Sequence, residues 1–432
     1  ACAVDLGLQP VQKPGGFGYW LWLASRDDLG AGTIRRLTES FGTPEFLYGA
    51  DRTQLIQAGL NKRQTDALCD KDLSGAQAIL RACEEKKIQI ITIEDSAYPD
   101  RLREIDDPPP VLYVRGRLPD FDRMPGITIV GTRSCSAYGL RMAERFSAAL
   151  AKAGFTIISG MARGIDSAAH RGCLKADGAT VAVLAGGVDL CYPPENRYLM
   201  GDIMLAGAVI SENPPGTPHE GFRFPIRNRI LSGLSAATLI VEAPARSGAM
   251  ISARRAFNQG REVFAVPGPL DVPGSVGCNQ LIRDEIARIA TSPMDIVHEL
   301  APMLGEPPQE ALIRKVWLRE LGGYGSLPAP EPEERRVQPI RVERRSAPDP
   351  APAPKAKPEV RQEPAKPDTA RALPDYLDGS ERQVAEALAA GADTVDALSE
   401  ATGLPAAEVA AALVLLELVG IAEQKVGHCR II

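Results

Sequence analysis

The sequence lacks long apolar runs and is poor in aromatic residues. None of its 432 residues lies in an uncharged apolar stretch near the roughly 18 residues that cross a bilayer, and the first residues carry no basic segment followed by an apolar one. We therefore expect a cytoplasmic protein without membrane contact. Aromatic residues make up 5%, but 44% hydrophobic and 24% charged residues are ordinary for folded domains, which excludes a disordered, collagen-like or coiled-coil chain. The length favours two to four domains.

The cysteines lack the pairing that a zinc or redox site needs. All eight are scattered, without a C-x-x-C pair. His170 and Cys173 lie three residues apart on a predicted helix, but no second pair follows and a closed metal site needs about four ligands. We expect neither a metal nor a cofactor. The formal net charge of −6 argues against a nonspecific polycation, although a local basic groove can still bind nucleic acid.

One segment lacks large apolar residues. Between residues 322 and 374, 12 of the 53 residues are Pro, and most of the others are Ala, Glu, Lys or Arg. Such a composition cannot bury a core and favours extended backbone, so we expect a linker between a large N-terminal body and a helical tail.

The first hundred residues show helical spacing. Apolar residues recur at helical intervals between residues 29 and 41, and a second helix is predicted after Gly59. The turn from Gly30 to Thr33 resembles the hairpin of helix-hairpin-helix modules, in which backbone N–H groups face a DNA phosphate. A helical domain that only packs on its neighbour is an equal alternative.

From residue 126 short apolar runs alternate with helix-like stretches. The runs cover residues 127–130, 155–159, 180–185, 207–211, 237–243 and 262–268. They predict a doubly wound α/β domain, in which a parallel sheet is covered on both faces and ligands bind beyond the carboxyl ends of the strands. We therefore divide the chain into an N-terminal helical domain (1–105), an α/β domain (106–305), a Pro-rich linker (306–375) and a C-terminal domain (376–432).

The turn after the first of these strands suits an anion. Gly131, Thr132, Arg133 and Ser136 combine small and hydroxyl residues with a guanidinium group at a predicted helix start. The spacing is not G-x-G-x-x-G and no acid follows the second strand, so we do not expect a dinucleotide. The turn predicts a phosphate contact, and a structural Arg133 paired with a carboxylate is the alternative.

Two glycines follow the second strand. Gly160 and Gly164 allow a close approach to the backbone. Asp166 opens the next helix, where we expect it to accept hydrogen bonds from backbone N–H groups rather than act as a general base. We expect His170, one turn later, to pack rather than to take part in catalysis.

Arginine alternates with aromatic rings between the fourth and fifth strands, at Phe222, Arg223, Phe224, Arg227 and Arg229. From residue 211 to residue 300 there are nine Arg and no Lys, so these are not simple solubilising charges. Guanidinium groups that hold phosphates beside rings that stack on bases suit single-stranded nucleic acid. An internal network, such as Arg229 with Glu242, is the alternative for some of them.

The fifth strand leads to a second Gly-containing helix start. Ser247 and Gly248 form another possible phosphate nest. Glu242, at the end of the strand, is the best candidate for a catalytic carboxylate, if there is one.

Several segments in fixed order carry a family resemblance. VGTRSCSAYG, SGMARGIDSAAHRG, VEAPARSGAMISARRA and REVFAVPG belong to a region, about residues 20 to 300, that resembles the DNA-processing protein A family, also called Smf. The resemblance implies a Rossmann-like domain that forms a homodimer and binds single-stranded DNA without strong sequence preference. It also implies a RecA recombinase partner, which the protein loads onto incoming strands during natural transformation.

The family's motifs fall on the residues singled out above. Its Gly-Ser-Arg turn falls on Gly131, Thr132 and Arg133, followed by Ser136, with Thr132 in place of the usual Ser. Its Phe-Pro-x-Arg-Asn-Arg segment falls on Phe224, Pro225, Arg227, Asn228 and Arg229.

The tail after the linker resembles a winged helix, with three helices and a short hairpin. The segment in the place of a recognition helix, residues 406–418, contains two Glu and neither Lys nor Arg. Because phosphate attraction needs cations, we favour protein contact over DNA reading for this domain.

These observations favour a non-enzymatic single-stranded DNA-binding protein with a recombinase partner. One rival is a nucleotide N-glycosidase of the Rossmann-like lysine decarboxylase-like family, although the Pro-Gly-Gly-x-Gly-Thr run before that family's catalytic Glu is absent here. The second rival is a structural adaptor protein, in which the linker and the C-terminal tail carry the function and DNA binding is incidental.

Overall fold

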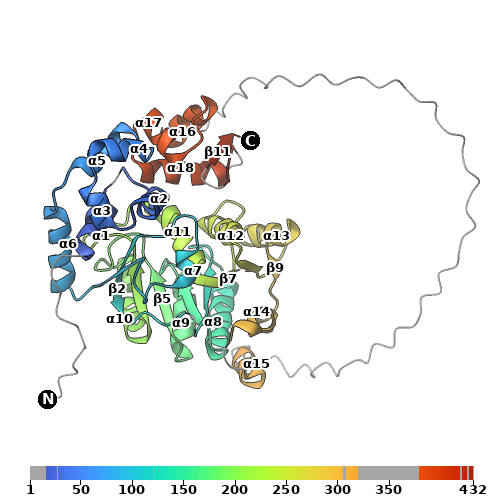
Figure 1. Cartoon of the computed structure of the whole chain (residues 1–432). Helices are drawn as coiled ribbons and strands as arrows, with labels where there is room; N and C mark the ends of the chain where they lie inside the picture. The colour runs from blue at the N-terminus through green and yellow to red at the C-terminus, as the bar shows by residue number, and fades with distance from the viewer. Residues whose placement is uncertain are drawn as a thin grey trace, which may run out of the picture.

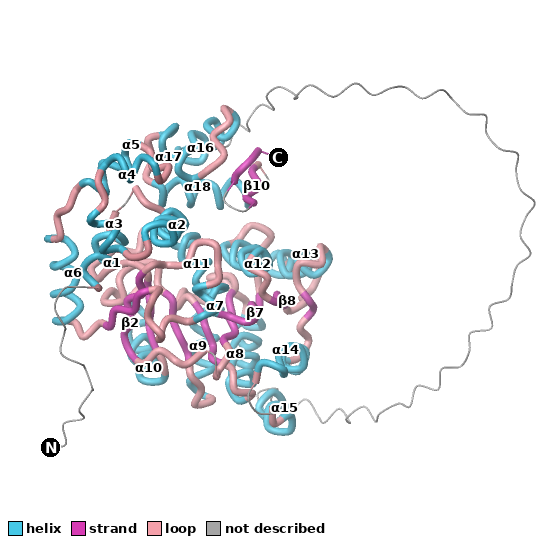
Figure 2. Tube along the Cα trace, viewed as in Figure 1, coloured by secondary structure: helices cyan, strands magenta, loops and turns pink. Residues whose placement is uncertain are grey.

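The protein is built around one large sheet that helices cover on both faces (Figures 1 and 2). The structure, a computed structural model, describes residues 16–26, 28–121, 123–304, 308–319, 379–418, 421–425 and 428–431. Within them the sheet has nine strands. The N-terminal helices, drawn blue, and the C-terminal helices, drawn red, lie together at the top of the view in Figure 1.

The N-terminal part is helical, as the spacing of its apolar residues predicts. Its helices are α1 (Phe17–Ala24), α2 (Ala31–Phe41), α3 (Pro44–Gly49), α4 (Arg52–Gln57), α5 (Lys62–Cys69) and α6 (Ser74–Glu85). Capping boxes start two of them, because Asp51 accepts from the Gln54 N–H and Asn61 accepts from the Gln64 N–H. Trp20 and Trp22 are buried in the core of this part.

The sheet confirms the predicted doubly wound α/β domain. Its strands are β1 (Gln89–Thr92), β2 (Val111–Gly116), β3 (Gly126–Val130), β4 (Thr156–Ser159), β5 (Thr180–Val183), β6 (Ala208–Ser211), β7 (Ser235–Ile240), β8 (Glu262–Ala265) and β9 (Arg288–Ile289). The order is β1-β2-β6-β5-β4-β3-β7-β8-β9, and the strands from β3 to β9 pair in parallel. The six predicted runs coincide with β3 to β8, although β3 and β7 begin one and two residues before their runs.

Three strands lie outside those runs. β1 and β2 extend the sheet by antiparallel pairing, and β9 adds two residues at the other edge. β1 falls within residues 1–105, which we expected to be helical throughout. Its residues show mixed burial, so they lack the continuous apolar pattern of the central strands.

Alternating strand residues separate two helical layers. Ile157 faces a core with α8 (Ala137–Lys152), α9 (Ile165–Lys175), α14 (Pro293–Leu300) and α15 (Glu310–Arg319). The next residue, Ile158, faces a core with α7 (Asp100–Arg103), α11 (Arg223–Leu234), α12 (Gly248–Asn258) and α13 (Val276–Arg283). The remaining helix, α10 (Arg197–Ala206), packs with Ala182 and the N-terminal helices. Fully buried strands explain why the runs are apolar throughout.

The C-terminal part has the expected three helices and hairpin: α16 (Gly379–Ala389), α17 (Val395–Thr402), α18 (Ala406–Leu418), β10 (Ala422–Lys425) and β11 (His428–Ile431). Helix α18 packs on α11 and α12. Asp396 of α17 accepts a hydrogen bond from the Thr33 hydroxyl at 2.9 Å and pairs with Arg36 at 3.3 Å, so this part contacts the start of α2.

The expected linker lies mostly outside the described residues. Helix α15 occupies the beginning of its range and packs on α8, where the rings of Phe146 and Trp317 lie 4.8 Å apart. Among the described helices, none alone has the length and apolar composition to cross a membrane, whereas the bent pair Val395–Thr402 and Ala406–Leu416 has both only when taken together.

Candidate nucleic-acid interface

The predicted site residues gather where the chain changes direction in the sheet. From β3 the chain continues to β4 on one side, whereas β7 pairs with β3 on the other. Such a switch point opens a crevice at the carboxyl ends of the strands. The turn after β3 and the residue after β7 are joined here, because Thr132 N–H donates to the Glu242 carbonyl at 2.7 Å.

The first turn holds a carboxylate of the protein itself. Ser136 is the N-cap of α8, and its hydroxyl accepts from the Gly139 N–H at 3.0 Å. The same hydroxyl donates to Glu242 Oε2 at 2.7 Å, and the Ser136 N–H donates to Glu242 Oε1 at 3.1 Å. The buried Glu242 therefore occupies the anion position at the start of α8. This corrects the expectation that Glu242 pairs with Arg229.

Arg133 projects from this turn and remains exposed. Its guanidinium carbon lies 5.0 Å from the centre of the Phe224 ring, a cation–π distance. Among the described residues no carboxylate forms an ion pair with it, so the alternative of a structural salt bridge is not observed. Arg133 thus presents an exposed charge, without an ion-pair partner among the described residues, at the carboxyl ends of the strands.

Three glycines near the turn that carries Arg133 have no room for a side chain. Gly164 has φ 76°, and a Cβ there would approach the Arg133 carbonyl to 2.7 Å, so a side chain is excluded on both counts. A Cβ on Gly160 would meet the Arg227 guanidinium at 2.6 Å. On Gly131 it would meet the Glu242 carbonyl at 2.7 Å. These three glycines permit close packing within the protein.

Asp166 and Arg227 form a buried charged layer under the turn. Asp166 Oδ2 accepts from the Gly160 N–H at 3.1 Å, as expected for a backbone-binding carboxylate. Arg227 donates to the carbonyls of Gly160 and Val183, which end β4 and β5. Burial raises the pKa of Asp166, and Arg227 opposes this shift. Burial lowers the pKa of Arg227, and the Asp166 carboxylate opposes this lowering.

Arg229 has its contacts inside the protein. Two of its nitrogens donate to the Glu212 carboxylate at 2.6 and 2.7 Å, and its Nε lies 3.0 Å from Asp107 Oδ2. Although burial lowers the pKa of Arg229, these two carboxylates raise it above the usual value. Sequence reasoning anticipated an internal network for Arg229, but with Glu242 as the partner.

The start of α11 is less enclosed. Phe222, Arg223 and Phe224 are partly exposed. Arg223 donates to Asn213 Oδ1 at 2.9 Å and pairs with Glu220, and its guanidinium lies over Phe222 at 4.8 Å. Both aromatic rings therefore already carry a guanidinium group.

The start of α12 lies beside α11. The Asn228 side chain accepts from Arg227 Nε and donates to the Gly248 carbonyl at 3.4 Å. Gly248 is exposed, and a Cβ there would meet nothing within 4 Å. The buried Ser247 hydroxyl has no hydrogen-bond partner among the described residues. At the predicted nest, Gly248 is therefore accessible, whereas the Ser247 hydroxyl is not.

His170 is a packing residue, as expected. It is fully buried, its Nδ1 is hydrogen-bonded to the Thr180 hydroxyl at 2.7 Å, and burial lowers its pKa to about 3. In the described part of the chain, His, Cys, Asp and Glu form no group of three or more that could hold a metal.

Two ring residues at the interface were missed from the sequence. Tyr192, in the loop after β5, stacks on His219, in the loop after β6, with centroids 5.3 Å apart and planes 22° apart. Tyr192 also lies 5.7 Å from Phe224. The available signal was their position, since loops after parallel strands meet at one edge of the sheet.

Comparison with known proteins agrees with this architecture. Residues 89–301 match the family of DNA recombination-mediator protein A, and residues 347–428 match the DprA winged helix domain. The Smf protein of Synechocystis is 40% identical over 274 residues, which are 62% of this chain and 68% of that protein. A Mycobacterium tuberculosis relative is 31% identical over 426 residues, or 96% of this chain and 94% of its own length.

A solved structure shows the same fold. The X-ray structure of DNA processing protein A from Streptococcus pneumoniae superposes with a TM-score of 0.58 at 32% identity and covers 65% of this chain and 97% of that one. The chain belongs to the DNA processing protein A (DprA/Smf) family of DNA recombination mediators and carries that family's winged helix domain.

Proposed function

We propose that this protein binds single-stranded DNA without strong sequence preference. It would act as a homodimer that loads RecA recombinase onto strands taken up in natural transformation. Membership of a DNA recombination-mediator family supports a role on DNA. The observation that carries the proposal is the exposed Arg133, which lacks an ion-pair partner among the described residues and lies on the Phe224 ring at the switch point of the sheet.

The chemistry of this edge matches a single strand. An exposed guanidinium group is a bidentate phosphate ligand, and aromatic rings accept bases of any sequence. Gly248 adds open backbone at the start of an eleven-residue helix, close to Asn228 of α11. A duplex would offer phosphates but no free base faces, so the rings favour the single strand.

We propose two tiers among the predicted site residues. Those that contact DNA lie in the turn after β3 and at the starts of α11 and α12, and they are exposed or partly exposed: Thr132, Arg133, Phe222, Arg223, Phe224 and Gly248. Ser247, beside Gly248, is partly exposed but its hydroxyl is buried, so it adds no side-chain contact. The others shape the edge through internal contacts: Gly131, Ser136, Gly160, Gly164, Arg227, Asn228 and Arg229.

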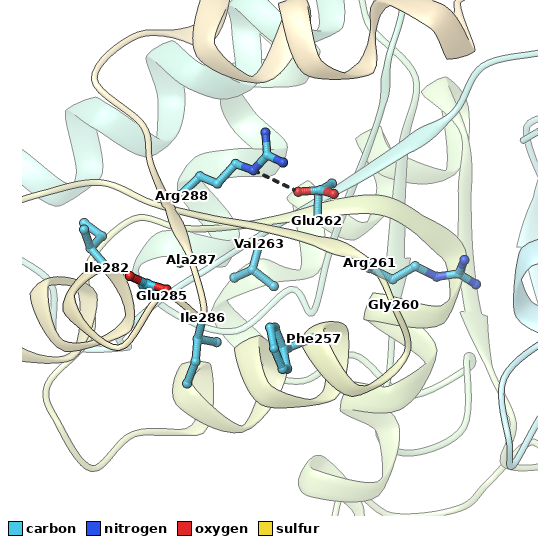
Figure 3. Close-up of a pocket in the computed structure, with 10 residues that line it drawn as sticks. All are labelled: Phe257, Gly260, Arg261, Glu262, Val263, Ile282, Glu285, Ile286, Ala287 and Arg288. Atoms are coloured by element: carbon cyan, nitrogen blue, oxygen red, sulfur yellow. Dashed lines mark ion pairs between the residues drawn. The ribbon is translucent and has the colours of Figure 1, made fainter.

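An exposed apolar surface near the end of the sheet supports the homodimer. Beside β9, the last strand of the sheet, lies a pocket of about 430 Å³ lined by residues of α12, β8, α13 and β9 (Figure 3). Phe257, which lines the pocket, and Ile289 of β9 are half exposed. Exposed apolar side chains beside a pocket favour burial against a second chain, and light scattering of the purified protein tests this.

A binding titration tests the proposal. Labelled single strands and the matched duplex are titrated with the full chain over a range of salt concentrations. We expect tighter binding of the single strand, with a linear fall of log affinity against log salt. Equal or tighter binding of the duplex would contradict the proposal. RecA filament formation on single strands, measured with and without the protein, tests loading separately.

A further inference from the structure

The aromatic rings near Arg133 differ in whether a guanidinium group already covers one of their faces. Arg133 lies over Phe224, and the Arg227 guanidinium carbon is 5.9 Å from the same ring. Phe222 carries Arg223. Cations over a ring take the face that a base would use, so the two phenylalanines serve first to hold guanidinium groups.

Tyr192 and His219 form a second pair of rings, over which no cation of the described residues lies. Tyr192 is 40% exposed; its ring stacks on His219, and its centre lies 5.7 Å from that of the tilted Phe224 ring. His219 Nε2–H donates to the Leu190 carbonyl at 3.0 Å, which fixes the imidazole against the loop. Burial lowers the pKa of His219, so the ring is neutral at pH 7 and adds a flat aromatic surface instead of another charge.

We propose that Tyr192 and His219 are the base-stacking platform of the DNA site, with Tyr192 receiving the base next to the phosphate that Arg133 holds. This inference rests on the proposed single-stranded DNA binding and assigns its base contact to residues outside the predicted motifs. Arg133 lies 5.0 Å and Tyr192 lies 5.7 Å from the centre of the same Phe224 ring, so we assign a phosphate at the one and a base at the other to neighbouring nucleotides.

The same geometry favours a single strand over a peptide or a duplex. The two rings are stacked and Tyr192 is 40% exposed, so a free base would extend this stack on the outer face of the Tyr192 ring. Bases in a duplex are already stacked on each other, so they would gain nothing from Tyr192. A peptide side chain would also pack on the apolar Tyr192 ring, but it would not require a flat aromatic face.

The test separates the base contact from the phosphate contact. Full-length wild type, Tyr192→Leu and Tyr192→Phe are titrated with oligothymidylate and with an abasic strand of the same length. Phe46→Leu, which removes an exposed ring from α3, is the matched control. We expect Tyr192→Leu to bind oligothymidylate roughly 5- to 100-fold more weakly, the loss of one stacked base, and to bind the abasic strand as wild type does. Tyr192→Phe keeps the ring and is expected to keep the affinity.

The remaining outcomes each contradict a stated claim. If Tyr192→Leu binds oligothymidylate as tightly as wild type, the platform is wrong while single-stranded DNA binding stands. An equal loss on both strands would show that the ring acts on the phosphate site or the fold, which also overturns the platform. If wild type prefers duplex, or binds neither strand, both proposals fail.

A second measurement needs no variant. Iododeoxyuridine in a single strand is photo-crosslinked to wild-type protein, and the attached residue is identified by mass spectrometry. We expect a crosslink at Tyr192 or His219. Crosslinks confined to Phe222 or Phe224 would overturn the platform even if Tyr192→Leu failed to fold.

Discussion

At the scale of single residues, the arginines near the sheet edge divide by what neutralises them. Arg229 is paired with Glu212 and Asp107, and Arg227 is bonded to strand carbonyls and faces Asp166. Arg133 lies over the Phe224 ring and forms no ion pair among the described residues, although the Asp166 carboxylate attracts it. An arginine whose charge is already neutralised inside the protein gains little from a phosphate. We therefore expect the loss of Arg133, rather than of Arg227 or Arg229, to weaken DNA binding most directly.

Arg133→Ala is expected to weaken single-stranded DNA binding uniformly across sequences. The plot of log affinity against log salt should become shallower by roughly one phosphate contact. Arg123→Ala is the matched control, because Arg123 is 87% exposed and precedes β3, at the opposite end of the strand. Unchanged affinity and slope in a folded Arg133→Ala protein would remove Arg133 from the site.

His170 is expected to make the protein less stable in acid. Its folded pKa of about 3 lies below the unfolded value of about 6.5, so the unfolded chain takes up the proton first as the pH falls. The stabilising contribution is complete above pH 6.5 and is lost toward pH 3. Between these limits the free energy of unfolding of wild type should fall about 1.4 kcal/mol per pH unit more steeply than that of His170→Asn. Denaturant unfolding at several pH values measures this, and parallel curves would contradict it.

Glu242→Gln is expected to lower stability without abolishing any activity. The amide replaces a carboxylate that accepts from the N–H and hydroxyl of Ser136 at the start of α8, which should cost about 1 to 2 kcal/mol. Thermal melting checks this against Glu39→Gln, a surface carboxylate on α2.

The same residue tests the glycosidase alternative. We expect no release of base from nucleoside monophosphates, because both carboxylate oxygens of Glu242 are hydrogen-bonded within the protein. Rate enhancements by enzymes are at least about a millionfold, so real turnover would be visible. Turnover in wild type that disappears in Glu242→Gln would replace the binding-protein proposal by a hydrolase.

At the scale of elements, α11 serves two purposes along its length. Its first turn, with Arg223 and Phe224, is partly exposed at the site. Residues 227–234 are buried between the sheet, α7 and α12. One helix therefore anchors the interface to the core, and a change in its buried half acts on stability first.

Arg229→Ala is expected to destabilise the protein by about 3 to 5 kcal/mol, because it leaves the Glu212 carboxylate unpaired in a mostly buried position. Where the variant remains folded, the salt slope of DNA binding should equal that of wild type. Arg283→Ala, on the surface of α13, is the control. A shallower slope in folded Arg229→Ala would place Arg229 at a phosphate.

At the scale of the whole molecule, the C-terminal part rests on both other parts. Helix α18 contacts α11 and α12, and Asp396 reaches Thr33 and Arg36 at the start of α2. The turn that resembles a DNA-binding hairpin is thus covered by a carboxylate of the winged helix domain. Arg133, Tyr192 and Phe224, in contrast, all belong to the α/β part.

Removal of everything after residue 320 is expected to leave a folded protein with most of its DNA affinity. The cut follows α15 and takes no residue from the cores on either face of the sheet. Circular dichroism and the same single-strand titration check this. If binding were almost lost, the C-terminal part would have to belong to the DNA site.

Sequence alone was sufficient for the fold class, because the short buried strands from β3 to β8 fall in largely apolar runs that alternate with helix-like stretches, the pattern of a parallel sheet covered on both faces. It also located the turn with Arg133, the helix starts and the winged helix domain. It did not predict β1, β2 or β9. β1 begins with the exposed Gln89 and both residues of β9 are exposed, whereas β2 has a buried apolar run that precedes the alternating region.

Tertiary structure decided which of the predicted residues face outward and which partners they take. Arg133 and Arg229 are the same residue type in equally suggestive motifs, but only the packing of α11 against Asp107 and Glu212 makes one internal and leaves the other exposed. Likewise Tyr192 and His219 are 27 residues apart in the chain and meet because the loops after β5 and β6 leave adjacent parallel strands. Local patterns specify elements, whereas contacts between distant residues depend on how those elements pack.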